Sequence, residues 1–150
     1  MTRSEAAAIF ARLLAEKNGD TISTAANTKF ADIPAHAWYS GYVKYLSNNG
    51  ITYGKSKTIF APNDAITRAE FTTMAVRFFD VYGDGDAEIM EQFSGFNDVS
   101  SGYWAAEYIK YAALHGWING YGDGSFHADR EINRAEVVTI VKRLLGREAD

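Results

Sequence analysis

The sequence predicts an all-α protein built from helix-loop-helix repeats. A shift of 66 positions aligns residues 30–80 with 96–146 without a gap and gives 15 identities in 51 positions. Within each copy, apolar side chains recur at the spacing of one helix face, and the same N-terminal capping pattern opens one helix. Self-similarity at a fixed period is typical of repeat architectures.

The chain opens in the middle of a repeat, because its first residues, Thr-Arg-Ser-Glu, match the Thr-Arg-Ala-Glu that opens the second helix of the next copy. At 150 residues the chain is long enough for one compact core, so we expect one domain. Polar linkers that contain glycine are expected to join the repeats. The expected parts are a single domain over 1–150, with the second half of repeat 1 in 1–20, repeat 2 in 30–80 and repeat 3 in 96–147.

The first helix of each full repeat follows a Phe-x-Asp segment and ends at a glycine, Gly50 or Gly116. Helical spacing places Trp38 and Trp104 on the apolar stripe of this helix. We therefore expect both in the core, and stacking on sugar rings is the alternative. Trp117 comes directly after the glycine stop and is better placed at the edge of a groove.

The second helix of each repeat has a stronger start signal. Thr67 and Glu70 have the spacing of a capping box, in which each side chain satisfies the other residue's backbone amide. Ile66 and Phe71 occupy the hydrophobic staple positions beside it. A catalytic role for the glutamates is the less favoured alternative. The same capping pattern recurs as Thr2 with Glu5 and as Asn133 with Glu136.

The segments between the two helices, 53–60 and 119–126, carry glycines and a closing phenylalanine. In the second copy an Asp-Gly pair stands at the tip. This composition predicts a tight turn between short extended pieces.

Composition excludes several functions. The net charge is −4 and no run of Lys or Arg is present, which argues against a nucleic-acid partner. Cysteine is absent, so the chain can form neither disulfides nor thiolate metal sites. No apolar stretch approaches the length of about 18 residues that a membrane span requires, and we expect none. No cofactor is expected.

The acidic linker near residue 80 has part of the spacing of a calcium-binding loop. Asp80, Asp84, Asp86 and Glu91 fall at ligand positions, but Tyr82 occupies one where an oxygen ligand is required. We therefore favour a solvated linker and expect no metal site. No Ser/His/Asp, Cys/His or paired-carboxylate constellation stands out, so no catalytic residue is expected.

These motifs together resemble the S-layer homology (SLH) repeat. The resemblance implies a pseudo-threefold helical bundle whose inter-repeat grooves bind cell-wall polysaccharide, often a secondary polymer that bears pyruvylated N-acetylmannosamine. It also implies a location outside the bacterial cell, at the cell surface or in the wall. In repeat 3 the matching residues are Phe96, Asp98, Val99, Trp104, Gly116, Gly120, Asp123, Gly124, Phe126, Ile132, Arg134 and Glu136.

The resemblance further implies that the arginine of the Thr-Arg-Ala-Glu motif contacts the ligand. Arg3, Arg68 and Arg134 each fall at the first position of a capped helix, where the positive end of the helix dipole favours an anion. A guanidinium there adds a bidentate clamp for a carboxylate. The alternative is a surface arginine that pairs with an acidic neighbour.

Asp32 and Asp98 are expected to cap the first helix or its approach, and hydrogen bonding to sugar hydroxyls is the alternative. Three further arginines, Arg12, Arg77 and Arg143, lie three turns into the second helices, where we expect packing between helices or ion pairs. The residues expected to bind ligand are Arg68, Arg134, Arg3, Asp32, Asp98, Gly54, Gly120 and Trp117.

The sequence therefore predicts a non-enzymatic module that anchors a larger protein to the bacterial cell wall by binding an anionic polysaccharide. One alternative is the targeting part of a wall-active hydrolase. Another is a structural module for self-assembly of a surface layer. The incomplete first repeat leaves room for self-association, in which a neighbouring molecule or a preceding segment supplies the missing half.

Overall fold

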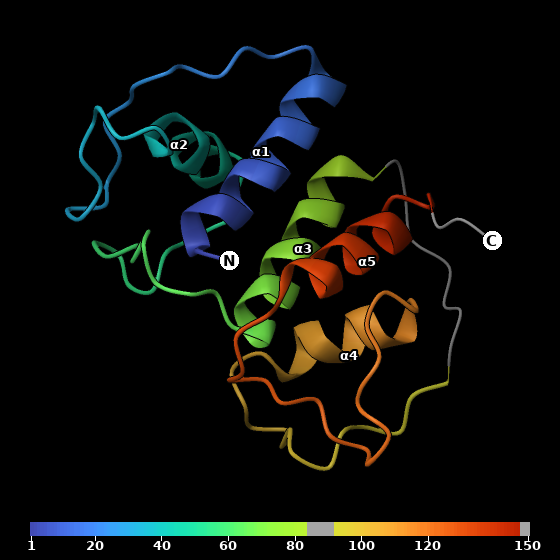
Figure 1. Cartoon of the computed structure of the whole chain (residues 1–150). Helices are drawn as coiled ribbons and strands as arrows, with labels where there is room; N and C mark the ends of the chain where they lie inside the picture. Colours follow the sequence, from blue (N-terminus) through green and yellow to red (C-terminus); the bar gives the residue numbers. More distant parts are fainter. Residues whose placement is uncertain (84–91, 148–150) are drawn as a thin grey trace. The chain divides into compact units, whose positions relative to one another are not determined.

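The computed structural model describes residues 1–83 and 92–147, and within them it contains helices and no strand (Figure 1). The predicted all-α class is confirmed. The pseudo-threefold arrangement of the repeats stays a prediction. The helices are α1 (Arg3–Asn18), α2 (Ser40–Asn48), α3 (Arg68–Tyr82), α4 (Ala106–Leu114) and α5 (Arg134–Leu144).

The chain forms two compact units. Unit 1 comprises Met1–Ile66 and Asp80–Tyr82, and unit 2 comprises Thr67–Phe79 and the described residues from Gly83 onward. Each unit combines the second helix of one repeat with the first helix and turn of the next. The structural unit is therefore offset by half a repeat from the sequence repeat, and the expected domain and repeat boundaries stay predictions.

All three predicted capping boxes are present, at the starts of α1, α3 and α5. At α3, the Glu70 amide donates to Thr67 Oγ1 at 3.1 Å, and the Thr67 amide donates to Glu70 Oε1 at 3.0 Å. Both staple residues, Ile66 and Phe71, are fully buried. These local contacts fix where each second helix begins.

The first helices begin later than predicted. Two successive turns precede α2, closed by hydrogen bonds from Ala37 N to the Pro34 carbonyl and from Ser40 N to the Ala37 carbonyl. Equivalent turns precede α4. The segment that carries the tryptophan is therefore not helical, and the helical spacing assumed from the sequence does not apply to it.

Trp38 and Trp104 consequently point outward, with 55% and 58% of their surfaces exposed. The prediction that they lie in the core is wrong. The turns move the apolar stripe by one position, so that Tyr39 and Ala105 are buried instead.

The segments that join the two helices are turns closed by backbone hydrogen bonds. Tyr121 N donates to the Ser125 carbonyl at 2.8 Å, and Lys55 N donates to the Ile59 carbonyl at 2.8 Å. The extended flanks expected from the sequence form only isolated bridges in the described residues, such as the one that joins Thr67 and Glu131.

Two glycines are required at the start of these turns. A Cβ atom at Gly54 would lie 2.4 Å from the Phe30 ring, and one at Gly120 would lie 2.4 Å from the Phe96 ring. Both would also come within 2.7 Å of a backbone oxygen in the turn. A ring therefore packs directly on the backbone at both positions.

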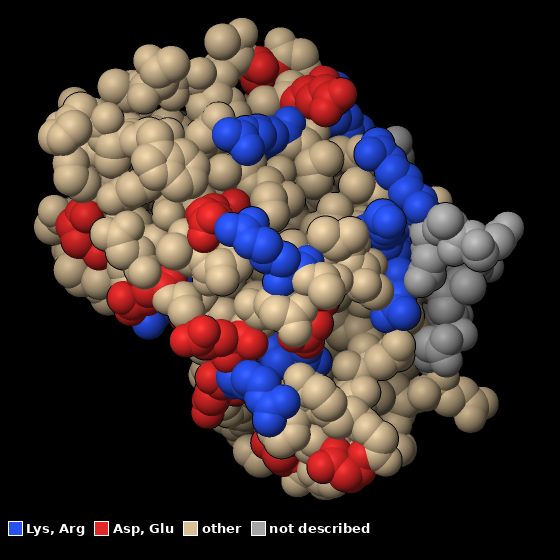
Figure 2. All heavy atoms as spheres, viewed as in Figure 1, with Lys and Arg blue, Asp and Glu red and all other residues tan. Residues whose placement is uncertain are grey.

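Each unit has its own apolar core. In unit 1, α1 packs on α2, and in unit 2 the inner faces of α3, α4 and α5 are buried. Side chains of both charges occur on the face that Figure 2 shows, and many lie next to the opposite charge. The largest fully buried side chains are Phe10, Leu14, Val43, Leu46, Ile51, Phe60 and Ile66 in unit 1, and Phe71, Phe78, Ile109, Phe126 and Ile132 in unit 2.

Candidate functional site

Arg68, at the first position of α3, is buried, with 5% of its surface exposed. Its Nε donates to the Phe126 carbonyl at 2.9 Å, and one terminal nitrogen donates to the Asn119 carbonyl at 3.5 Å. The guanidinium also forms an ion pair with Glu136 and lies 4.5 Å from the centre of the Phe126 ring. Burial lowers the pKa of Arg68, and repulsion from Arg130 acts in the same direction. Arg68 thus holds the turn of repeat 3 onto α3.

Arg3 makes the equivalent contacts in unit 1. It is 4% exposed, its Nε donates to the Phe60 carbonyl at 2.7 Å, and its guanidinium lies 4.9 Å from the centre of the Phe60 ring. Arg134, the third member of the set, is exposed at the start of α5. The arginine at the start of the second helix is therefore buried and holds a turn in α1 and α3. The equivalent arginine in α5 is exposed.

Asp32 and Asp98 hold the turns and do not cap the first helices, so the capping prediction is wrong for both. The Asp98 carboxylate accepts hydrogen bonds from the amides of Phe126 and His127, both at 2.8 Å. Asp32 accepts the equivalent pair from Phe60 and Ala61, at 2.9 and 2.7 Å. The sequence missed this role because the bonded amides lie 28 and 29 residues farther along the chain.

The aspartates stabilise an uncommon backbone conformation. Ala61 and His127 have φ values of 60° and 57°, in the left-handed region that residues other than glycine rarely adopt. Although desolvation acts to raise the pKa of Asp98, the two amide hydrogen bonds and the nearby His127 lower it below the ordinary value. The carboxylate therefore favours its charged form while it holds the turn.

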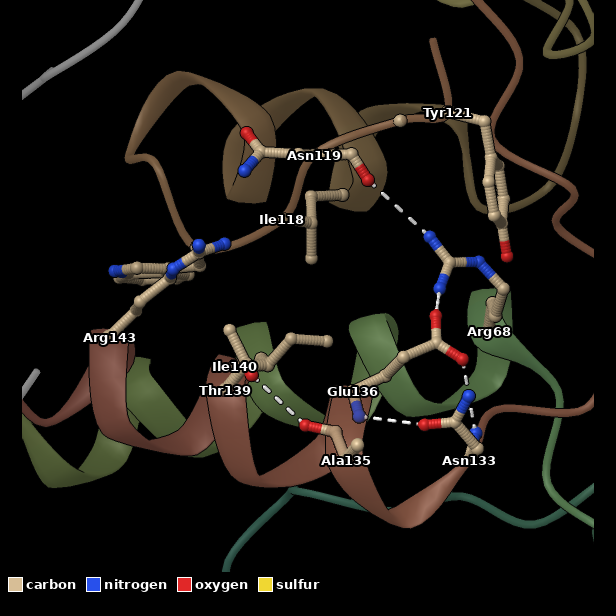
Figure 3. A pocket seen from close by; sticks show the side chains of 12 residues that line it. Arg68, Ile118, Asn119, Tyr121, Asn133, Ala135, Glu136, Thr139, Ile140 and Arg143 are labelled. Carbon is tan, nitrogen blue, oxygen red and sulfur yellow. Dashed lines mark hydrogen bonds and ion pairs between the residues drawn. The ribbon is translucent and has the colours of Figure 1, made fainter.

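A groove of about 320 Å³ lies in unit 2 between α5 and the segment that follows α4 (Figure 3). Three of the predicted ligand residues, Arg68, Trp117 and Gly120, line it. The complete lining is Arg68, Trp117, Ile118, Asn119, Gly120, Tyr121, Asn133, Ala135, Glu136, Thr139, Ile140 and Arg143.

The groove has different chemistry at its two ends. In Figure 3, the Arg68–Glu136 pair lies on one side of the view and Arg143 lies on the other. Ile118 and Ile140 lie between them. At the first end, the ion pair brings the arginine and the carboxylate together. The arrangement therefore offers an apolar middle and a second cation at the other end.

Arg143 is the groove residue that the sequence assigned to another role. Arg12 and Arg77 pack between helices as predicted, since each guanidinium lies over the ring of Tyr42 or Tyr108 and donates to its hydroxyl. Arg143, at the same register, is half-buried and lines the groove. The sequence predicted the same role for all three arginines because they occupy the same position in their helices. Only the tertiary structure shows that Arg143 differs from Arg12 and Arg77.

Asn119 positions the Arg143 side chain. With the amide oriented to satisfy both groups, Asn119 Oδ1 accepts a hydrogen bond from a terminal Arg143 nitrogen at 3.2 Å, and Asn119 Nδ2 donates to the Ile118 carbonyl at 3.2 Å. Asn119 therefore fixes the Arg143 guanidinium in the wall of the groove.

Trp117 is more buried than the edge position expected from the sequence. It is 4% exposed and packs against the rings of Phe79, Tyr111 and His115, with centroid distances of 4.6, 5.7 and 5.2 Å. Trp117 therefore belongs to the core, and it also forms part of the groove wall. The other predicted ligand residues, Arg3, Asp32, Gly54, Asp98 and Arg134, do not line this groove.

The described residues contain no group of three or more His, Cys, Asp or Glu that could hold a metal ion. Most of the acidic linker considered for calcium, residues 84–91, lies outside the described part of the chain. Among the helices in residues 1–83 and 92–147, none is long and apolar enough to cross a membrane.

The chain is similar to proteins of the bacterial surface. The S-layer homology domain model matches residues 29–72 and 95–138. A cellulosome-anchoring protein of Acetivibrio thermocellus is 32% identical over 149 residues, which cover 98% of this chain and 32% of that protein. A surface-layer 125 kDa protein of Lysinibacillus sphaericus is also 32% identical over 149 residues, with coverage of 97% and 12%.

An exoglucanase of Acetivibrio thermocellus, XynX, is 32% identical over 145 residues, which cover 97% of this chain and 13% of the enzyme. The chain thus spans about a third or less of the length of these relatives. The family match covers more than half of the chain and includes most of each full repeat. The chain belongs to the S-layer homology family and is a bacterial cell-surface protein associated with the wall.

Proposed function

We propose that the chain anchors a larger protein to the cell wall by binding an anionic polysaccharide in the groove of unit 2. The observation that carries this proposal is the position of Arg143 at one end of an apolar groove with amide and hydroxyl groups in its walls. Sugar-binding sites need such a mixture, because a pyranose has both apolar C–H faces and hydroxyl edges.

The anionic group of the ligand is best accommodated near Arg143. The planar guanidinium can donate two parallel hydrogen bonds to a carboxylate, such as that of a pyruvyl ketal. Arg68 already donates to two carbonyls and pairs with Glu136. We therefore assign Arg68 to shaping the first end of the groove, with Trp117 and Gly120 in its walls. A ligand role for Arg3, Arg134, Asp32, Asp98 and Gly54 stays a prediction.

Recognition must be short-range. The chain is acidic, with a net charge of −4, and acidic and basic side chains are neighbours on the face that Figure 2 shows. Long-range attraction therefore does not draw an anionic polymer to this protein. Binding depends on contacts inside the groove, which are less exposed to screening by salt than charges on an open surface.

The groove lacks the arrangement that hydrolysis of a glycosidic bond requires. Such enzymes use two carboxyl groups that flank the bond. Among the residues that line the described groove, Glu136 is the only carboxylate, and it serves the capping box and the Arg68 pair. We infer that the chain is not catalytic. Its similarity to a small part of an exoglucanase supports a role as the wall-targeting part of a larger protein, which can be an enzyme.

The proposal is tested with isolated cell-wall sacculi, before and after extraction of the secondary polymer. The purified chain should sediment with intact sacculi and not with extracted ones. Arg143→Ala should weaken this binding roughly ten- to a hundred-fold, because it removes a charge-assisted clamp. Lys142→Ala is the matched control, since Lys142 is exposed on the same helix and does not line the groove.

Equal sedimentation with intact and extracted sacculi would contradict a polysaccharide ligand. Equal binding by the Arg143→Ala and Lys142→Ala variants would refute the assignment of the groove while leaving wall anchoring in place.

A further inference from the structure

Two exposed tryptophans recur at equivalent positions outside the groove. Trp38 lies before α2 in unit 1, and Trp104 lies before α4 in unit 2. Their exposed fractions, 55% and 58%, are nearly the same. The two repeats share only 15 of 51 positions, so an identical, exposed indole in both needs an explanation.

Packing does not supply that explanation. The recurrent Phe60 and Phe126 are buried, with 0% and 1% exposure, and the recurrent Tyr42 and Tyr108 are half-buried beside arginines. In the segment before each first helix, the buried positions belong to Tyr39 and Ala105. Leaving an indole in water forgoes the favourable free energy of burial. The recurrence therefore indicates a surface that is used in binding.

The indole rings are held by neighbouring aromatic side chains. Trp38 contacts the rings of Tyr39 and Tyr42 at centroid distances of 5.4 and 6.3 Å, both in edge geometry. Trp104 contacts the Tyr103 ring at 5.8 Å, and the Tyr103 hydroxyl donates to Asp129 Oδ1 at 2.9 Å. Rings fixed in this way lose little conformational freedom when a ligand binds.

We infer that Trp38 and Trp104 are sugar-stacking platforms, one in each unit, that bind the saccharide backbone of the wall polymer independently of its charge. The face of an indole matches the apolar C–H side of a pyranose. A protein partner would need an interface of about 800 Å² on each side, far more than one indole offers. Equivalent platforms on repeated units also suit a ligand that is itself a repeating chain, because linked contacts raise the overall affinity.

This inference rests on the proposed function, since it takes the ligand to be a polysaccharide, but it uses other residues and another interaction. The experiment compares Trp38→Ala, Trp104→Ala and the double variant with the unmodified chain. Tyr53→Ala is the matched control, because Tyr53 is 53% exposed and its counterpart in the next repeat is Asn119. Far-UV circular dichroism and thermal unfolding establish that each variant is folded.

Affinity is measured by titration calorimetry with purified wall polymer and with the same polymer after its carboxyl groups have been reduced. Each Trp→Ala variant should bind both polymers roughly five- to thirty-fold more weakly, the range expected for loss of one aromatic stacking contact. Trp→Phe variants should retain part of the affinity. Tyr53→Ala should bind like the unmodified chain, and Arg143→Ala should lose affinity for the native polymer only.

Unchanged affinity of the double Trp→Ala variant, together with weakened binding by Arg143→Ala, would overturn the platforms and leave the groove in place. An equal loss in the Tyr53→Ala control would also overturn them, because any exposed aromatic residue would then suffice. The reverse pattern, with weakened Trp variants and unchanged Arg143→Ala, would support the platforms and refute the groove. If the unmodified chain binds neither polymer, both proposals are wrong.

Discussion

The two units hold their turns onto the preceding helix in the same way but differ in what surrounds that contact. Arg3 in unit 1 and Arg68 in unit 2 each donate from Nε to the carbonyl of a buried phenylalanine, at 2.7 and 2.9 Å. An aspartate binds two amides of each turn. The recurrent residues Arg, Phe, Asp and Gly therefore build one frame twice.

The differences lie at positions that the repeats do not share. In unit 2 the groove wall carries Asn119 and Tyr121, and the corresponding residues in unit 1 are Tyr53 and Lys55. Asn119 also orients Arg143 in the groove. Recurrence combined with burial thus marks the scaffold, and the non-recurrent Asn119 orients the recurrent Arg143 in the groove. Trp38 and Trp104, which recur and are exposed, form a third class of residues.

The strongest test of the shared frame is removal of its arginines. Arg3→Ala should lower the free energy of unfolding by about 2–3 kcal/mol, because it leaves a buried carbonyl without its donor. Arg68→Ala should lower it by about 3–4 kcal/mol, since it leaves the Phe126 carbonyl without its donor and Glu136 without its ion-pair partner. Urea denaturation followed by far-UV circular dichroism measures both. A stable Arg68→Ala variant that fails only in binding would show that this arginine is a ligand residue and not part of the frame.

The glycines test the close approach of ring to backbone. Gly54→Ala and Gly120→Ala should each lower the free energy of unfolding by about 2 kcal/mol, because the added Cβ meets a backbone oxygen that cannot move freely. Gly54→Ala should have the larger effect, since Gly54 has a φ of 78° and an alanine there is strained as well. Gly102→Ala is the control, because nothing lies within 4 Å of its Cβ position. Equal stability of all three variants would contradict the packing.

The capping glutamates of α3 and α5, both in unit 2, test the capping boxes on a smaller scale. Glu70→Ala should lower the free energy of unfolding by about 1 kcal/mol through loss of the capping box. Glu136→Ala should lower it by about 2 kcal/mol, because it removes both the capping box and the ion pair with the buried Arg68. Thermal unfolding of the two variants measures both effects. A Glu136→Ala effect of only about 1 kcal/mol, that of a capping box alone, would mean that the Arg68–Glu136 pair adds no stability.

The smallest expected effect is the pH dependence that Asp98 contributes. Its pKa is lower in the folded chain than the ordinary value, so it stabilises the fold above the unfolded pKa of about 4, and this contribution is lost as the pH falls through the folded pKa. The unfolding temperature of an Asp98→Asn variant should therefore fall less steeply than that of the unmodified chain below about pH 4. Parallel curves would contradict a charged Asp98 in the turn.

Much of the fold could be predicted from local sequence. The all-α class and the starts of α1, α3 and α5 follow from helical periodicity and from capping residues three positions apart, and the structure confirms them. The start of the first helices could not be predicted in this way, because the turns before them interrupt the periodicity. This error also placed Trp38 and Trp104 in the core.

The roles of the site residues depend on contacts between distant segments. Arg68 was expected to be a ligand clamp, and that role stays a prediction. Its structural role could not be predicted, because its partner carbonyl lies 58 residues away. Arg143 has the same register as Arg12 and Arg77 but a different neighbourhood. Periodicity describes the neighbours along one helix, and it contains no information about which turn will cover that helix.

The central claim, that the groove of unit 2 binds the anionic wall polysaccharide, is tested most directly by nuclear magnetic resonance. The isotope-labelled chain is titrated with fragments of the wall polymer, and the backbone and side-chain nitrogen signals are followed. We expect the largest shifts at the Asn119 side chain, the Gly120 amide, Thr139 and the Arg143 Nε. Unchanged signals at these four positions, at polymer concentrations that saturate binding, would contradict the claim.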